Sequence, residues 1–104
     1  MYYRLYTGKD NKSHMEEFNP PDNMPATSVV FRNQPLGTFI DWHTAPRKQF
    51  LVTLEGEVEI GTGDGILHIL GPGDMMLAED ITGQGHTTRV IGNKDRISIA
   101  IPVE

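Results

Sequence analysis

Apolar and polar residues alternate along much of the chain with a period of two. Near the C-terminus, Ile97, Ile99 and Ile101 share one face of an extended segment, while Ser98 and Ala100 share the other. Such alternation is typical of a β-strand. No long segment combines a helical period with freedom from Gly and Pro. The pattern therefore predicts β-structure throughout.

Turn signals divide the alternating stretches into short strands. The segment Thr62-Gly63-Asp64-Gly65 is the strongest signal, because Asp and Gly tolerate the positive φ that hairpin turns need. Further reversals are indicated at residues 55–57, 71–74 and 82–85, each of which contains glycine. About eight short strands without crossover helices predict an antiparallel sandwich or barrel.

The 104 residues are expected to form one domain, because a chain of this length builds a single hydrophobic core. Strand patterns recur from residue 28 to residue 104, which we expect to be the core of the domain. Residues 1–27 are more polar and contain several turn residues. We expect this part to form edge strands followed by a Pro-rich loop.

Charge and composition exclude several classes of protein. Nine Lys and Arg against 14 Asp and Glu give a net charge of −5, and the basic residues are scattered, so no nucleic-acid partner is expected. The absence of cysteine excludes disulfides, thiolate metal clusters and cysteine nucleophiles. No apolar run is long enough for a membrane span or a signal segment, which predicts no membrane partner and a cytoplasmic location.

Two of the four histidines lie at the ends of predicted strands, where a site at the mouth of a barrel would be built. His43 ends an apolar strand, and His86 opens a strand after a glycine-rich turn. His68 has apolar neighbours on both sides, and His14 lies in the polar N-terminal segment. We therefore take His43 and His86 as the candidate site residues.

The spacing around His43 resembles the first motif of the cupin superfamily. Gly37, His43, Gln49 and Gly56 are separated by five, five and six residues, as are the Gly, the first His, the Glu and the last Gly of that motif. Two departures are evident: Gln49 stands at the Glu position, and Ala45 stands where the motif has its second His.

A second segment resembles the second cupin motif. Gly83 and His86 have the spacing of its Gly and His, while Glu79 takes the place of its Pro and Val90 that of its Asn. Two additional residues separate Glu79 from Gly83. The resemblance covers about Gly37 to Val90 and implies an all-β fold, an antiparallel double-sheeted β-barrel of the jelly-roll type.

The resemblance also implies which side chains would hold a metal. A full cupin site offers imidazole and carboxylate ligands, which suit Fe, Mn, Ni, Cu or Zn. In this chain the implied ligands of a divalent transition metal are His43, Gln49 and His86. We expect weaker binding than in a full site, because the Gln49 amide is neutral and Ala45 cannot ligate.

Glu79 and Asp80 are expected to supply a missing carboxylate, either as a further ligand or as a catalytic acid or base. Period two also predicts the ligand pocket, if the side chains of His43, Gln49 and His86 face the barrel interior. The pocket residues expected on this basis are Phe39, Asp41, Leu51, Thr53 and Thr88.

Two functions are compatible with these residues. The first is a metal-assisted enzyme of the oxygenase, isomerase or lyase type that acts on a small organic molecule, and His43, Gln49 and His86 favour it. The second is a metal-free cupin that binds a small ligand or works without a cofactor, and Ala45 favours it. A purely structural domain would not need two histidines at these positions.

A small barrel leaves sheet edges and an apolar outer face that a second copy of the chain would cover. We therefore expect a homodimer. The residues expected on this outer face are Trp42, Phe50, Val52 and Leu54.

Overall fold

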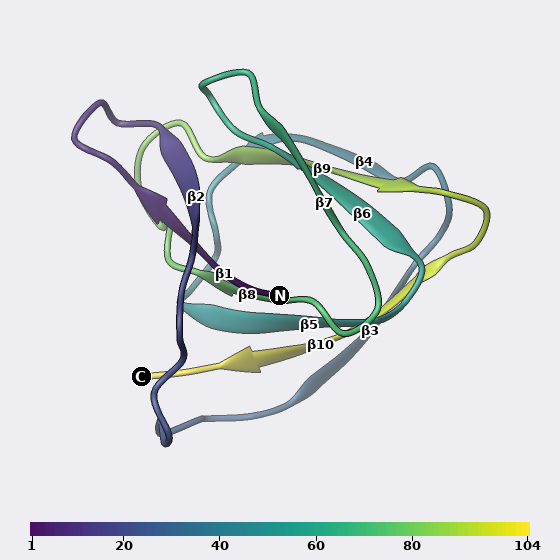
Figure 1. Ribbon diagram of the computed structural model, residues 1–104, viewed down its shortest axis with the longest axis horizontal. Helices are drawn as coiled ribbons and strands as arrows, with labels where there is room; N and C mark the ends of the chain where they lie inside the picture. Colours follow the sequence, from purple (N-terminus) through teal and green to yellow (C-terminus); the bar gives the residue numbers. More distant parts are fainter.

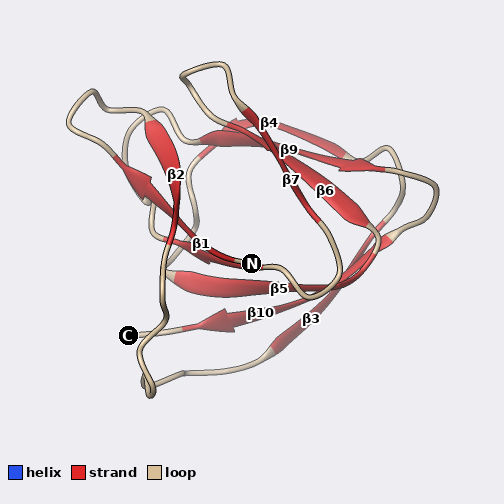
Figure 2. Ribbon diagram, in the orientation of Figure 1, coloured by secondary structure: helices blue, strands red, loops and turns tan.

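The computed structural model describes residues 1–104 and contains strands and loops only (Figure 2). The strands are β1 (Tyr2–Thr7), β2 (Ser13–Glu17), β3 (Val30–Gln34), β4 (Phe39–His43), β5 (Gln49–Glu55), β6 (Glu57–Gly61), β7 (Leu67–Leu70), β8 (Met75–Ala78), β9 (His86–Ile91) and β10 (Arg96–Pro102). They form a six-stranded sheet in the order β2-β1-β8-β5-β10-β3 and a four-stranded sheet in the order β4-β9-β6-β7, which face each other (Figure 1). The predicted all-β, double-sheeted jelly roll is confirmed.

The two sheets are antiparallel except at one pair of strands. β1 lies parallel to β8, with Tyr2–Leu5 beside Met75–Ala78. The strongest hairpin signal of the sequence joins β6 to β7, where Val58 pairs with Leu70 and Gly61 pairs with Leu67. At Gly56, by contrast, the chain leaves the six-stranded sheet and enters the four-stranded one.

The N-terminal segment belongs partly to the barrel itself. β2 is an edge strand, but β1 is paired on both sides, with β2 and with β8. Leu5 on β1 is completely buried and is part of the main hydrophobic cluster. The expectation that residues 1–27 contribute only edge strands and a loop is therefore wrong for β1, because Leu5 is an inward-facing residue of the core.

The barrel interior receives residues from both sheets. The four-stranded sheet contributes Val58, Ile60 and Leu70, and the six-stranded sheet contributes Leu5 and Met76, all of them buried. These apolar side chains pack together at the centre of the molecule. The same interior also contains buried polar groups, which define the site described below.

On β10 the inward face is the one with the polar and small side chains. Arg96, Ser98 and Ala100 are each at most 2% exposed, whereas Ile97 and Ile99 on the other face are only partly buried. The isoleucine face of this strand therefore covers the outside of the six-stranded sheet. This orientation brings the guanidinium of Arg96 into the barrel.

The residues expected on an apolar outer face lie on two different sheets. Phe50, Val52 and Leu54 belong to β5 in the six-stranded sheet, near the strongly exposed Phe31 of β3, while Trp42 belongs to β4 in the four-stranded sheet. The homodimer stays a prediction.

The structure contains no helix that could cross a membrane.

Candidate functional site

A cavity of about 320 Å³ lies between the two sheets and receives side chains from both. Its apolar walls come mainly from Ile40, Leu51, Ile60 and Met76. The remaining lining combines imidazole, amide, hydroxyl and guanidinium groups. These polar residues are His43, His86, Gln34, Gln49, Thr44, Thr88, Arg32 and Arg96. The cavity thus has the mixed character typical of sites for small organic ligands.

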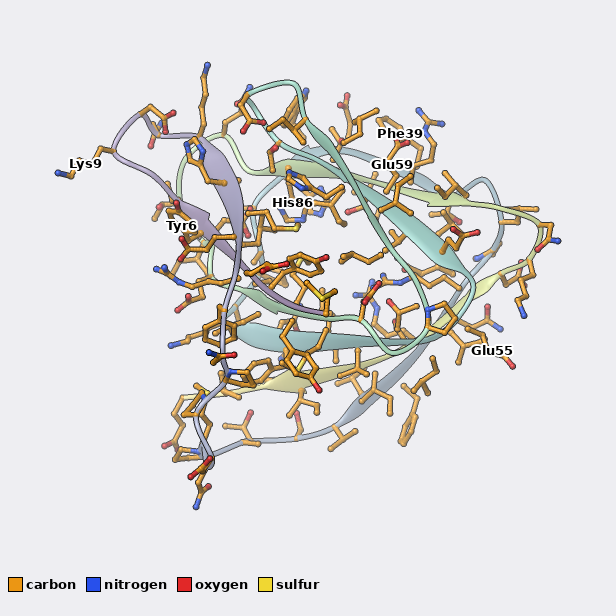
Figure 3. The ribbon with its side chains drawn as sticks, in the orientation of Figure 1. Tyr6, Lys9, Phe39, Glu55, Glu59 and His86 are labelled. Carbon is orange, nitrogen blue, oxygen red and sulfur yellow. The ribbon has the colours of Figure 1, made fainter.

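The two candidate histidines lie directly opposite each other on neighbouring strands. His43 is the last residue of β4, His86 is the first residue of β9, and the two are in register. Their ring centroids are 4.4 Å apart, and the rings are inclined at 55°. Figure 3 shows His86 pointing from β9 toward the barrel interior.

Each of the two imidazole rings is oriented by a hydrogen bond at its Nδ1 atom. His43 Nδ1 donates to the carbonyl oxygen of Asp41 at 2.7 Å, and His86 Nδ1 donates to Asp80 Oδ2 at 2.5 Å. Because both acceptors require a protonated Nδ1, the Nε2 atom of each neutral ring carries the free lone pair. Neither Nε2 atom has a hydrogen-bond partner in the protein, so both remain available to a molecule in the cavity.

Asp80 lies behind His86 rather than in the cavity wall. Its side chain is 0% exposed, and Oδ2 accepts hydrogen bonds from Ser13 Oγ at 2.6 Å and from His86 Nδ1. Its other carboxylate oxygen, Oδ1, has no partner. The backbone carbonyl of Asp80 also accepts from the amide of Ala45 at 3.0 Å. Asp80 therefore positions His86 and does not reach a ligand itself.

Three further residues predicted for the site, Gln49, Leu51 and Thr88, line the cavity. Thr53 is buried two residues beyond Leu51 on β5, where its hydroxyl accepts hydrogen bonds from Arg96. Thr53 thus contributes to the site through Arg96.

The prediction that Phe39 and Asp41 face the pocket is wrong. Phe39 is 46% exposed on the outer side of the four-stranded sheet, with the Arg89 guanidinium 4.3 Å from its ring centroid (Figure 3). The strand register shifts between Ile40 and His43, which indicates a bulge. Because the bulge breaks the alternation, Ile40 and His43 line the cavity while Phe39 and Asp41 do not.

Glu79 does not line the cavity, so it does not supply the carboxylate predicted for the site. Its carboxylate forms an ion pair with Arg4 on β1 at 2.5 Å and another with Lys48 at 3.2 Å. Burial alone raises the pKa of Glu79, but the hydrogen bonds and charges of Arg4 and Lys48 outweigh it and hold the pKa below its usual value. Glu79 therefore joins β1 to the neighbouring part of the barrel and is not a site residue.

Two arginines, Arg32 and Arg96, and the amide Gln34 belong to the site although the sequence pattern did not predict them there. All three line the cavity, and Arg96 Nη1 donates to Gln34 Oε1 at 2.9 Å. The sequence signal that could have identified Arg96 was the period-two alternation of β10, because Arg96 shares its face of the strand with Ser98 and Ala100. The isoleucines on the opposite face were the more conspicuous pattern.

The other two histidines lie outside the cavity and have partners of their own. His14 contacts Asp10, with a nitrogen–oxygen distance of 2.9 Å, and His68 Nε2 lies 3.2 Å from the hydroxyl of Thr62. Burial lowers the pKa of His68. Neither residue is part of the site.

The donors around the cavity fit a metal ion only in part. Two imidazoles with free Nε2 atoms are the arrangement expected of histidine ligands whose Nδ1 is held by an oxygen acceptor. However, no group of three or more His, Asp or Glu side chains is placed to hold a metal ion, and Gln49 is neutral. The lining also contains two guanidinium groups and no carboxylate. These residues therefore suit an organic ligand better than a metal cation.

Comparison with solved structures shows the fold. An uncharacterized protein with a double-stranded β-helix domain from Klebsiella pneumoniae matches with a TM-score of 0.57 and 23% identity, over 82% of this chain and 81% of its own. An RmlC-like cupin protein from Desulfovibrio desulfuricans matches with a TM-score of 0.52 and 18% identity, over 86% of this chain and 97% of its own. The chain has the cupin fold, as its resemblance to the superfamily implied.

A protein from Neisseria meningitidis also shares this fold, with a TM-score of 0.56 and 17% identity over 84% of this chain and 89% of its own. No family model matches the sequence, and no curated protein matches it.

Gly85 allows the backbone just before His86 to pass close to the backbone of His43. Its φ is +79°, and an added Cβ would overlap the carbonyl oxygen of His43. We expect Gly85→Ala to lower the free energy of unfolding by about 1–2 kcal/mol for the left-handed backbone, and by about 1–3 kcal/mol more for the overlap. Gly65→Ala is the matched control, because Gly65 has φ +85° with open space around it. Equal losses in urea denaturation would contradict this role of Gly85.

The ion pairs of Glu79 predict a pH-dependent contribution to stability. Because its folded-state pKa is lowered, ionised Glu79 stabilises the fold above its unfolded value of about 4.3, and this is lost as the pH falls through the lowered pKa. We expect Glu79→Gln to lower the free energy of unfolding by about 1 kcal/mol at pH 7, and by progressively less below about pH 4. Denaturant unfolding at several pH values measures this. Glu17→Gln, at an exposed carboxylate without an ion pair, should have no effect, and a pH-independent loss in Glu79→Gln would refute the assignment.

Proposed function

We propose that this cupin binds a small organic molecule in its barrel cavity and that His86 transfers a proton to and from it, without needing a metal. The reaction class is that of an isomerase or lyase acting at a carbon next to a carbonyl group. The observation that carries the proposal is the buried hydrogen bond between Asp80 and His86, which leaves His86 Nε2 free on the cavity side.

The chemistry requires a base that is oriented and shielded from bulk water. His86 is 5% exposed, and the carboxylate behind it holds its ring in one tautomer. When Nε2 takes a proton from the ligand, the nearby Asp80 carboxylate stabilises the resulting imidazolium. The imidazolium can then return the proton to a second carbon, or to a leaving group, which completes an isomerisation or an elimination.

Gln49 is proposed to donate a hydrogen bond to the carbonyl oxygen of the ligand, and His43 to accept one at Nε2 from an O–H or N–H group of the ligand. His43 lies with its ring centroid 4.4 Å from that of His86, and its Nε2 has no protein partner. Gln49 is 5% exposed, and its amide can donate a hydrogen bond to an oxygen atom. Both groups line the same cavity as His86, so a ligand held by one can reach the other.

Deuterium exchange tests the proposed proton transfer. We expect the wild-type protein to accelerate exchange of the C3 protons of 2-oxobutyrate in deuterium oxide, followed by ¹H NMR. His86→Ala should reduce the rate by about 100-fold or more, the usual contribution of a general base, and Asp80→Asn should reduce it by about tenfold or more. His68→Ala should leave it unchanged, because His68 lies outside the cavity.

The exchange experiment can also overturn the proposal. A wild-type rate no faster than buffer, or a His86→Ala rate equal to wild type, would contradict proton transfer by His86. A ¹⁵N NMR spectrum of the imidazoles would establish independently whether Nδ1 of His86 carries the proton toward Asp80.

A metal-assisted reaction is the second candidate, favoured by the free Nε2 atoms of His43 and His86. The divalent ion, of Fe, Mn, Ni, Cu or Zn, would be held by these two residues and Gln49, and it would polarise an oxygen atom of the ligand. We expect such an ion to be held weakly, because none of the three ligands is negatively charged. Elemental analysis of untagged protein, before and after incubation with each ion, measures this directly.

The variants His43→Ala and His86→Ala provide the controls for the metal measurement. Near-stoichiometric metal that both variants lose would favour the metal-assisted function over the metal-free one. Less than a tenth of an equivalent after incubation, in protein that still exchanges deuterium, would exclude it.

A further inference from the structure

Arg96 is a buried cation without an acidic partner. It is the first residue of β10 and only 2% exposed. Its Nε and Nη2 donate to Thr53 Oγ1, and its Nη1 donates to Gln34 Oε1. No carboxylate lies within ion-pair distance of Arg96, although the chain contains 14 Asp and Glu. A charge buried in this way is costly unless a counter-charge accompanies it.

The hydrogen bonds to Arg96 leave part of its binding capacity unused. A guanidinium has five N–H donors, and three of them are used by Thr53 and Gln34. One N–H on each terminal nitrogen, Nη1 and Nη2, therefore has no acceptor. A carboxylate is a suitable acceptor for these donors, because charge-assisted hydrogen bonds are about twice as strong as neutral ones.

A second arginine strengthens the positive charge at the same place. Arg32 lies on β3, with its side chain on the inward face next to Ser98, and it also lines the cavity. It has no ion pair either. Burial, with the charge of Arg32, lowers the pKa of Arg96 to about 10, so Arg96 remains a cation at neutral pH. The cavity wall thus contains two cations and no carboxylate.

We infer that Arg96 and Arg32 bind the anionic group, a carboxylate, of the small molecule that occupies the cavity. The inference rests on the proposed function in one respect, that the cavity holds a ligand, and it adds the chemical class of that ligand. It does not depend on the proton transfer by His86.

The dimensions of the site set the size of this anion. Along β5, Thr53 beside Arg96 lies four residues beyond Gln49, or about 13 Å at about 3.3 Å per residue. The cation end and the histidine end of the cavity are therefore separate. The volume of about 320 Å³ lies at the lower end of the range of ligand pockets, roughly 300–1,000 Å³. A carboxylic acid of roughly this size, with an apolar middle against Leu51 and Ile60, matches these features.

Calorimetric titration with benzoate, at constant ionic strength, tests the inference. Benzamide is the neutral match for benzoate, and inorganic phosphate is the probe for an anion of another shape. We expect benzoate to bind at least tenfold more tightly than benzamide and phosphate. Arg96→Gln and Arg32→Gln should each weaken benzoate binding at least tenfold. Arg89→Gln removes the same charge from the outer face of the barrel and should bind like wild type.

Thermal unfolding distinguishes a ligand-binding arginine from a structural one. We expect Arg96→Met to unfold at the same temperature as the ligand-free wild type or higher, because it removes an uncompensated buried charge. Benzoate should raise the midpoint of the wild type and not that of Arg96→Met. If the Arg96 variants do not fold, Arg32→Gln takes their place, because Arg32 is only half-buried. Benzoate should then raise the unfolding midpoint of the wild type and not that of Arg32→Gln.

The outcomes separate this inference from the proposed function. Equal benzoate affinity in wild type, Arg96→Gln and Arg32→Gln, or no preference for benzoate over benzamide, would overturn the inference. Tighter binding of phosphate than of benzoate would indicate that the anionic group of the ligand is a phosphate rather than a carboxylate. That result would also overturn the inference. Failed deuterium exchange in wild-type protein whose benzoate binding is intact would count against the proton transfer alone.

Discussion

The buried carboxylate of Asp80 connects parts of the chain that are far apart in sequence. Its Oδ2 accepts from Ser13 on β2 and from His86 on β9, while its backbone carbonyl accepts from Ala45 in the loop before β5. The other carboxylate oxygen has no partner in the protein, so Ser13 and His86 donate the two side-chain hydrogen bonds that this carboxylate accepts. Such a group tolerates little displacement of its neighbours. The position of His86, and with it the polar end of the cavity, depends on this contact.

The polar groups of the interior are divided between two ends of one cavity. At one end, Asp80 is the only buried carboxylate, and it is turned away from the ligand space toward His86. At the other end, Arg96 is surrounded by neutral acceptors and by a second cation, Arg32. Glu79, the other carboxylate predicted for the site, is paired with Arg4 and Lys48 outside the cavity. A ligand with a negative group therefore complements the interior better than a metal cation does.

Much of the fold and the two histidines were predictable because they depend on local patterns. Period-two alternation and glycine-rich turns mark the strands, and motif spacing identified His43 and His86, which the sheet places in register. The pocket prediction failed at Phe39 because a bulge in β4 breaks the alternation that it assumed. Glu79 was a reasonable carboxylate candidate, but it pairs with Arg4 and Lys48 outside the cavity. The parallel contact of β1 with β8, which buries Leu5, has no local signal either.

The sequence by itself determined that the chain forms short strands, which residues share a face of each strand, and that two histidines lie at strand ends. Only the tertiary structure decided which face of each strand is inside. On β10 the isoleucines form the more hydrophobic face, yet Arg96, Ser98 and Ala100 are the buried ones. The reason is physical: alternation states which side chains point the same way, whereas burial depends on the strands and sheet packed against them. The partners of Arg96, and its lack of a counter-charge, follow from that packing alone.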